Sequence, residues 1–201
     1  MIETSTECCS AALAEDGKVI ASRRCDTPKL HASTLAPFCA DVLAEAGITA
    51  SDCSAVAVSG GPGSYTGLRV GVSTAKGICF GAGIPLIGVD TLRILALSAE
   101  GSFDRIVAMI DARRMEVYAA VFDGKGARLG ETAAVILDEN SFAKELSEGT
   151  VLFIGTGVEK FKAVCSSPNA SFQTCFPAAD RMAVPAFESY AKKRVQRRCV
   201  L

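Results

Sequence analysis

The chain has 201 residues, of which 49% are hydrophobic, so it is long enough for one large domain or two small ones with a substantial core. Its formal net charge is −1, with acidic and basic residues interspersed, which excludes a strong field that would attract a nucleic-acid backbone unaided. We therefore expect a globular protein that would need a partner for any role on RNA.

Cysteine and histidine usage excludes a metal centre built on these residues. The nine cysteines contain no C-x-x-C pair, and His31 is the only histidine, which we interpret as a helix-start residue. Most cysteines lie among apolar neighbours, as small buried hydrophobes do in a reducing compartment. The chain shows no signal-peptide pattern, and its longest apolar run, residues 77–89, is too short for a bilayer. We expect a cytoplasmic protein without a membrane or metal partner.

The first hundred residues predict an α/β unit. Asp16-Gly17 favours a tight hairpin between two strands, because both central positions of such a turn need positive φ. Helical spacing of apolar residues predicts one helix ending before Gly47 and another after the glycine-rich segment. The expected strands cover residues 1–4, 8–15, 18–26, 55–59 and 85–89, and the expected helices cover residues 31–46, 66–82 and 91–99. Strand, helix and strand over residues 55–89 predict a parallel crossover with its loop at the carboxyl end of a strand, where ligands bind in open α/β sheets.

The second half repeats this pattern. A strand ends in the acid Asp111, another strand follows, and Asp123-Gly124 repeats the hairpin signal. The expected strands cover residues 105–111, 116–122, 127–137 and 151–155, and the expected helices cover residues 141–146, 158–165 and 178–193. The repetition predicts a duplicated α/β unit with its boundary near residues 97–104. The basic run at residues 192–201 is interpreted as a solvated end with no role in RNA binding.

The loop after the strand at residues 55–59 allows two interpretations. Its glycines could turn backbone amides toward an anion at a helix N-terminus, although the spacing fits neither the P-loop nor the dinucleotide fingerprint. The same glycines could simply allow a tight turn with positive φ. The residues of the candidate nucleotide or phosphate loop are Gly60, Gly61, Gly63, Ser64, Thr66 and Arg69.

The helix that follows the loop has two uncharged sides. At about 100° per residue, the side expected to face the sheet carries Leu68, Gly71, Val72, Ala75, Ile78, Cys79 and Ala82. The outward side carries Val70, Ser73, Thr74, Gly77, Phe80 and Gly81. A solvated helix should be charged there, so this helix is either buried within its own domain or covered by a partner.

Catalytic interpretations are weaker. Ser64 does not lie in a G-x-S-x-G motif, and His31 has no identifiable catalytic partner. Glu3 and Asp111 end strands where a phosphotransferase could hold Mg²⁺, or each could be a solvated carboxylate at a strand end, which we favour.

Several segments resemble the TsaB family, whose members are accessory proteins of threonylcarbamoyladenosine synthesis in tRNA. The likeness is close over residues 2–124, most specific in the glycine loop, and loose beyond residue 157. It rests on Ile2-Glu3-Thr4-Ser5-Thr6-Glu7, His31-Ala32-Ser33-Thr34-Leu35, Ser59-Gly60-Gly61-Pro62-Gly63-Ser64-Tyr65-Thr66-Gly67-Leu68-Arg69-Val70-Gly71, Gly83-Ile84-Pro85, Ile110-Asp111-Ala112-Arg113 and Glu116-Val117-Tyr118.

The resemblance implies a two-lobed, actin-like α/β fold of the sugar kinase and Hsp70 type, with lobes at residues 1–100 and 101–201. It implies a non-catalytic subunit that binds the catalytic protein TsaD together with the ATPase TsaE, forms a homodimer when alone, and meets tRNA only through the complex. No cofactor would be held tightly, with weak ATP or ADP binding at the shared interface. The implied partner surface adds His31 and Leu35 to the outward residues of the second helix.

Two other functions are weighed against this one. An ATP-dependent phosphotransferase of the same fold would hold Mg²⁺ on Glu3 and Asp111. Tight Mg-ATP binding by the isolated chain would favour this function. A glycopeptidase-like peptidase is suggested only by kinship with TsaD, and the sequence offers no catalytic constellation for it.

Overall fold

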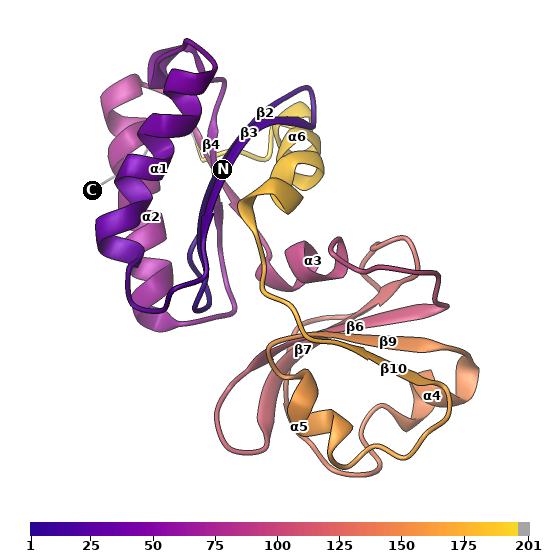
Figure 1. The fold of residues 1–201 in the computed structure, drawn as a ribbon. Coiled ribbons are helices and arrows are strands. Elements are labelled where there is room, and N and C mark those ends of the chain that lie inside the picture. The colour runs from indigo at the N-terminus through magenta and orange to yellow at the C-terminus, as the bar shows by residue number, and fades with distance from the viewer. Residues whose placement is uncertain (197–201) are drawn as a thin grey trace. The chain divides into compact units, whose positions relative to one another are not determined.

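A computed structural model describes residues 1–196 of the chain (Figure 1). The chain divides into two compact units, one formed by residues 1–91 with the segment from Pro177 onward, and the other by residues 92–176. The sequence placed the last helix in the second lobe, whereas the structure groups it with the first unit. The end of the basic run, residues 197–201, lies outside the described residues. Within the described part, no helix combines the length and the apolarity that a membrane crossing requires.

The first unit is built on a mixed sheet with strand order β3-β2-β1-β4-β5. Its strands are β1 (Ile2–Glu3), β2 (Cys9–Glu15), β3 (Lys18–Cys25), β4 (Val56–Ser59) and β5 (Leu86–Val89). β4 runs parallel to β1 and β5, and β2 runs antiparallel to β1 and β3. The predicted hairpin turn is confirmed, because Asp16 and Gly17 have φ of 47° and 79°.

Helices cover both faces of this sheet (Figure 1). They are α1 (His31–Glu45), the 3₁₀ turn η1 (Ala50–Asp52), α2 (Tyr65–Ala82), the 3₁₀ turn η2 (Ala179–Met182) and α6 (Ala183–Ala191). α1 and α2 lie side by side on one face, where Val56 and Val58 join Ala75 in a core cluster. The intervening Ala57 faces the side of α6, because successive strand residues point to opposite faces.

The second unit repeats the arrangement. Its elements are α3 (Thr91–Ala96), β6 (Arg105–Asp111), β7 (Glu116–Asp123), β8 (Ala133–Ile136), α4 (Ala143–Glu148), β9 (Val151–Gly155), α5 (Val158–Lys162) and β10 (Ala170–Gln173). The strand order is β10-β9-β6-β7-β8. Both faces of the sheet are buried, since Ile106 and Ala108 of β6 pack in one core cluster and Val107 and Met109 in the other.

The predicted duplication is visible in the strand order. β8-β7-β6-β9-β10 in the second unit follows the same sequence of antiparallel and parallel pairings as β3-β2-β1-β4-β5 in the first. Glu3 and Asp111 therefore occupy equivalent strand ends. Two expectations were wrong in the second unit: the strand expected over residues 127–137 covers only β8, and β10 was not expected.

Candidate functional site

The glycine loop joins β4 to α2 as a tight turn held by backbone hydrogen bonds. The amide of Gly60 donates to the Val89 carbonyl at 2.7 Å, and the Gly61 carbonyl accepts from the Thr91 amide at 3.0 Å. Gly61 has a φ of 99°, a conformation that favours glycine. Ser64 caps α2, with its hydroxyl accepting from the Gly67 amide at 3.3 Å.

The glycines on the inner side of α2 allow the helix to lie directly on the segment that follows β1. A Cβ on Gly67 would overlap the Thr4 carbonyl oxygen, and one on Gly71 would overlap the Thr4 hydroxyl. Thr4 Oγ1 donates to the Gly67 carbonyl at 2.8 Å, and the Ser64 amide donates to the Ser5 carbonyl at 2.6 Å. Close packing between backbones thus explains these glycines without a ligand.

The residues of the candidate phosphate loop are partly committed to the protein itself. The amides of Gly60 and Ser64 already donate to carbonyl oxygens, so these two donors are not offered to an anion. Arg69 is exposed, and its guanidinium lies 5.4 Å from the centre of the Tyr65 ring. Thr66 is exposed on the first turn of α2. Nucleotide binding at the loop stays a prediction, and it would have to rely on the remaining polar groups, the side chains of Arg69 and Thr66.

The outward side of α2 is left open by the unit to which it belongs. Phe80 has 67% of its surface exposed, and a Cβ on Gly77 or Gly81 would meet no atom within 4 Å. Ser73 is exposed, and Thr74 is half-buried. Val70 differs from the expectation, because it packs against the core cluster that contains Ile2 and Leu35. We call Ser73, Thr74, Gly77, Phe80 and Gly81 the outer face of α2.

The two predicted interface residues of α1 lie away from an open surface. Leu35 is only 1% exposed and belongs to the core between α1, α2 and the sheet, so it cannot contact a partner directly. The family resemblance alone placed it on the partner surface, whereas the helical spacing of apolar residues that predicts α1 includes Leu35. His31 is half-buried, with Nε2 at 2.8 Å from the Thr6 carbonyl oxygen, which ties the helix start to the segment after β1.

The exposed side of α1 was missed; its residues are small and uncharged up to Ala40, and the exposed acids Asp41 and Glu45 follow. It consists of Ala32, Ser33, Ala36, Pro37 and Ala40, followed by Asp41. The alanines recur every four residues, a spacing that puts them on one stripe of a helix. This spacing was present in the sequence and would have pointed to the stripe.

Glu3 and Asp111 are poorly suited to hold Mg²⁺. Glu3 is fully buried, its Oε1 accepts from the Ser5 amide at 2.6 Å, and burial raises the pKa of this carboxyl. A neutral carboxyl is a weak ligand for a hard cation. Asp111 is exposed and pairs with the Lys160 ammonium at 2.8 Å. Among the described residues, no group of three or more His, Cys, Asp or Glu side chains is arranged to hold a metal.

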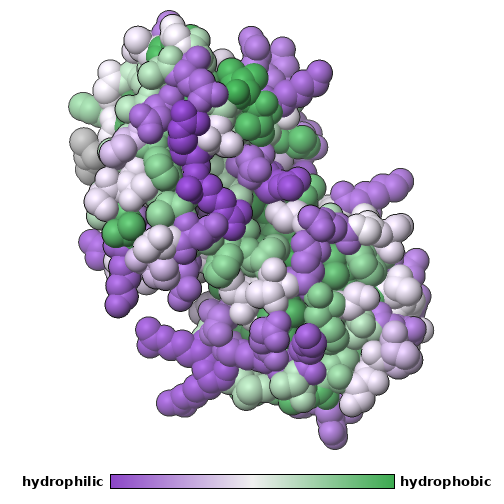
Figure 2. All heavy atoms as spheres, viewed as in Figure 1, coloured by the Kyte–Doolittle hydropathy of each residue, from purple (hydrophilic) through white to green (hydrophobic). Residues whose placement is uncertain are grey.

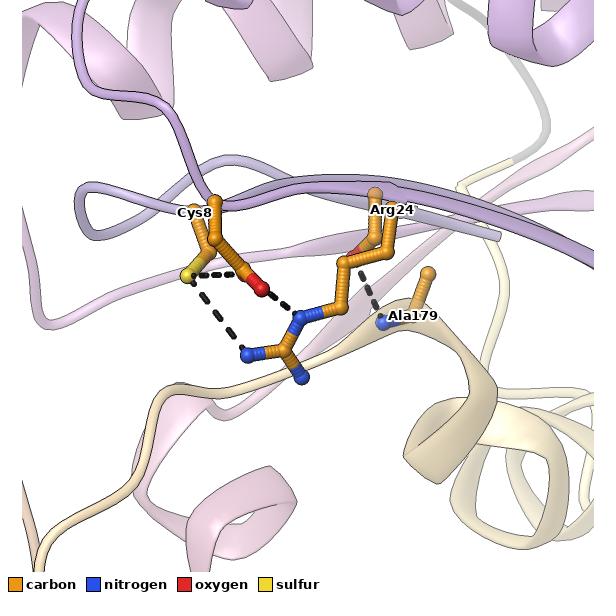
Figure 3. A network of polar contacts seen from close by, with 5 residues as sticks. Cys8, Arg24 and Ala179 are labelled. Atoms are coloured by element: carbon orange, nitrogen blue, oxygen red, sulfur yellow. Dashed lines mark hydrogen bonds and ion pairs between the residues drawn. The ribbon is translucent and has the colours of Figure 1, made fainter.

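A network of polar contacts near η2 links the buried Cys8 to the exposed side chains of Arg24 and Asp26 (Figure 3). Cys8 Sγ donates to Asp26 Oδ1 at 2.9 Å, and Arg24 Nε pairs with the same oxygen at 2.6 Å. Burial raises the pKa of the Cys8 thiol to about 12, so this thiol stays protonated at neutral pH. The hydroxyl of Ser10 accepts from the Ala179 amide at 2.9 Å and fastens η2 to the sheet.

Comparisons with known sequences agree with the resemblance. Residues 25–197 match the family described as "TsaD: tRNA N6-adenosine threonylcarbamoyltransferase". The "tRNA threonylcarbamoyladenosine biosynthesis protein TsaB" of Escherichia coli strain K12 is 33% identical over 200 residues, which is 95% of this chain and 86% of the relative. The protein of the same name from Bacillus subtilis strain 168 is 32% identical over 161 residues, which is 77% of this chain and 69% of the relative.

Solved structures extend the likeness beyond residue 157, where the sequence resemblance was loose. YeaZ from Pseudomonas aeruginosa matches with a TM-score of 0.86 at 30% identity, over 98% of this chain and 93% of that chain. The activator of the 2-hydroxyisocaproyl-CoA dehydratase from Clostridium difficile, solved with bound ADPNP, matches with a TM-score of 0.52 at 11% identity over 96% and 95% of the two chains. This second likeness concerns the fold alone and supports the two-lobed, actin-like α/β architecture. Taken with the sequence matches, these findings show that the chain belongs to the TsaB family and acts in the biosynthesis of threonylcarbamoyladenosine in tRNA.

Proposed function

We propose that the chain is a non-catalytic accessory subunit that binds a TsaD-like catalytic subunit through the outer face of α2 and the exposed stripe of α1. The observation that supports this proposal most strongly is the open outer face of α2, where an aromatic ring stands between two glycines that nothing in their own unit covers. Exposed glycines in a helix cost about 1 kcal/mol each relative to alanine, so their presence is easier to explain if another helix must come close.

The side chains that could carry out chemistry are engaged in structural roles, which favours an accessory role over catalysis. Glu3 is buried, with a pKa raised by desolvation, and Cys8 is a buried thiol hydrogen-bonded to Asp26. His31 contacts a backbone carbonyl at the start of α1. The subunit would therefore support its partner by binding it, with tRNA reached only through the assembled complex.

Gly77→Arg tests the docking surface. A long charged side chain on the outer face would be buried without a counter-charge in the complex, so we expect binding to a purified TsaD-like subunit to weaken at least about tenfold, equivalent to about 1.4 kcal/mol. Arginine is a better helix former than glycine, and the position is exposed, so the unbound variant should stay folded.

Ala191→Arg is the matched control, because it adds the same side chain at an exposed position of α6 on the opposite side of the first sheet. The control should bind the catalytic subunit as the native chain does. Unimpaired binding by Gly77→Arg, or equal loss in both variants, would contradict the proposed surface. Light scattering of the chain alone should show whether the same variant disrupts a homodimer, which we propose uses the same surface.

We also propose that a TsaE-like ATPase joins the complex and that ATP or ADP binds weakly near the glycine loop at the shared interface. Arg69 and Thr66 are the exposed polar residues of the loop that support this placement. Calorimetry should detect nucleotide binding only when the catalytic subunit is present. Tight Mg-ATP binding by the isolated chain would instead favour the phosphotransferase interpretation.

A further inference from the structure

Two cysteines face each other across the hairpin of the first unit. The β2–β3 register pairs Cys9, at the start of β2, directly with Cys25, at the end of β3. Residues that lie directly opposite in an antiparallel pair point to the same face of the sheet. Cys9 faces the helix side, where it packs in the core cluster with Leu35, so Cys25 points to that side as well.

The distances set by the register fit a disulfide. Directly opposed residues in an antiparallel pair have Cα atoms about 4.5–5.5 Å apart, within the range of about 4.4–6.8 Å found across disulfides. Their Cβ atoms lie about 4.5–5.5 Å apart, slightly more than a disulfide prefers, so the strands must close by a small amount. The Cys25 sulphur is also close enough to contribute to the raised pKa of the Cys9 thiol, after the larger effect of burial.

We propose that Cys9 and Cys25 form a reversible cross-strand disulfide when the folded protein meets hydrogen peroxide. Both are free thiols in the structure. Cys25 is half-buried, whereas Cys9 is only 1% exposed, so the oxidant reaches Cys25 first. The slight closing of the strands strains the bond and makes it easy to reduce.

The chemistry needs no group besides the peroxide and the two thiols. Cys25 loses its proton, and the thiolate attacks one oxygen of hydrogen peroxide, so that an S–O bond forms and the O–O bond breaks; the leaving hydroxide takes up the proton and becomes water, and Cys25 is left as the sulfenic acid. Burial raises the pKa of Cys9 to about 11, so Cys9 reacts as the protonated thiol: its sulphur attacks the Cys25 sulphur and forms the S–S bond, while its proton passes to the sulfenic oxygen, which leaves as water. In total, two thiols and one hydrogen peroxide give one disulfide and two water molecules.

The position of the pair connects this modification to the docking surface. The bond would join the two open ends of the β2–β3 hairpin, and Cys25 is followed at once by the loop that leads into α1. Cys39 of α1 is a competing partner, because it packs against the same cluster and also contributes to the raised pKa of Cys9. The experiment must therefore tell the two pairings apart.

Peptide mapping of the full chain makes this distinction. The folded protein is treated with hydrogen peroxide, its remaining thiols are alkylated, and it is digested with trypsin without reductant. Cleavage after Lys18, Arg24 and Lys29 leaves Cys8 and Cys9 in residues 1–18, Cys25 in residues 25–29, and Cys39 together with Cys53 in residues 30–69. We expect a linked pair of residues 1–18 and 25–29, with the intact mass lowered by about 2 Da, the mass of two hydrogens.

The link should disappear in Cys9→Ser and in Cys25→Ser, and after dithiothreitol. It should persist in Cys8→Ser, and also in Cys165→Ser, a matched control at a half-buried cysteine of the second unit. A link between residues 1–18 and 30–69 would overturn the proposal, as would a sulfinic acid on Cys25 without a link or an unchanged intact mass. These outcomes are read on the native chain and do not depend on whether a variant folds.

Discussion

Gly67→Ala and Gly77→Ala are the same substitution on the same helix, and the structure predicts opposite effects. A Cβ on Gly77 would meet no atom within 4 Å, whereas one on Gly67 would overlap the Thr4 carbonyl oxygen and lie 3.4 Å from the Ser64 Cβ. If the glycines of α2 served only the turn and the ligand loop, the two variants would behave alike. The pair therefore tests the assignment of the inner glycines to packing and the outer ones to the surface.

The magnitudes follow from these contacts. Alanine is favoured over glycine in a helix interior by about 1 kcal/mol, so Gly77→Ala should raise the free energy of unfolding by up to about that amount. At Gly67 the overlapping atom belongs to the backbone and cannot rotate away, which costs about 1–3 kcal/mol. Losing the hydrogen bond from Thr4 to the Gly67 carbonyl costs about 1 kcal/mol more. After the helix gain is subtracted, Gly67→Ala should lower the free energy of unfolding by about 1–3 kcal/mol.

Urea unfolding measures both changes as shifts of the midpoint at constant slope. Because the chain has two compact units, the result should be checked by hydrogen exchange of the α2 amides, which reports the stability of the first unit by itself. A Gly67→Ala variant as stable as the native chain would refute the close-packing argument. A destabilised Gly77→Ala variant would show that the outer face is covered by the chain itself.

Three further substitutions test the buried side of the first unit. Glu3 has a pKa raised above its ordinary value of 4.5, so as pH rises above that value the unfolded chain ionises first and stability falls. Glu3→Gln should remove this fall in stability, so the urea midpoint of the variant should rise relative to that of the native chain between pH 4 and about 8. A midpoint difference that stays constant over this range would contradict the prediction. Leu35→Ala should lower the free energy of unfolding by about 2–5 kcal/mol, because Leu35 is buried in the core. A loss below about 1 kcal/mol would contradict this burial and indicate a surface position. Ser10→Ala leaves the Ala179 amide without its partner, so it should cost about 1–3 kcal/mol and speed amide exchange in η2; unchanged exchange would argue against that anchor.

Local patterns predicted most of the elements. Asp16-Gly17 identified the hairpin because few residue pairs adopt two consecutive positive φ angles as readily. The repeated order of strand, acid and strand identified the duplication. β10 escaped notice because Ala170–Gln173 is short and shows no clear alternation. The packing of α6 against the first sheet could not be predicted in this way, because it joins segments far apart in the sequence and local patterns carry no information on such contacts.

The candidate site was predicted in outline but not in detail. Helical spacing correctly separated an open side of α2 from a side facing the sheet, yet it placed Val70 on the open side. Leu35 was placed on the partner surface by the family resemblance and not by the spacing, and it is buried. The Val70 error arose because small apolar residues on every side of α2 leave the direction of the core ambiguous. The buried residues of α2 are Gly67, Gly71, Ala75 and Cys79. Small residues at every fourth position therefore mark the side of this helix that lies close to the rest of its unit.

The two sheets share a strand order but differ in the helices that cover them. After the equivalent strands β4 and β9, α2 has 18 residues and α5 has 5; after β3 and β8, α1 has 15 and α4 has 6. The second unit shows that short helices, together with the rings of Phe142, Phe153, Phe161 and Phe172, suffice to shield a sheet of this topology. The additional turns of α1 and α2 thus exceed what is needed to shield the sheet, so the first copy carries a long helical pair whose outer sides its own core does not require.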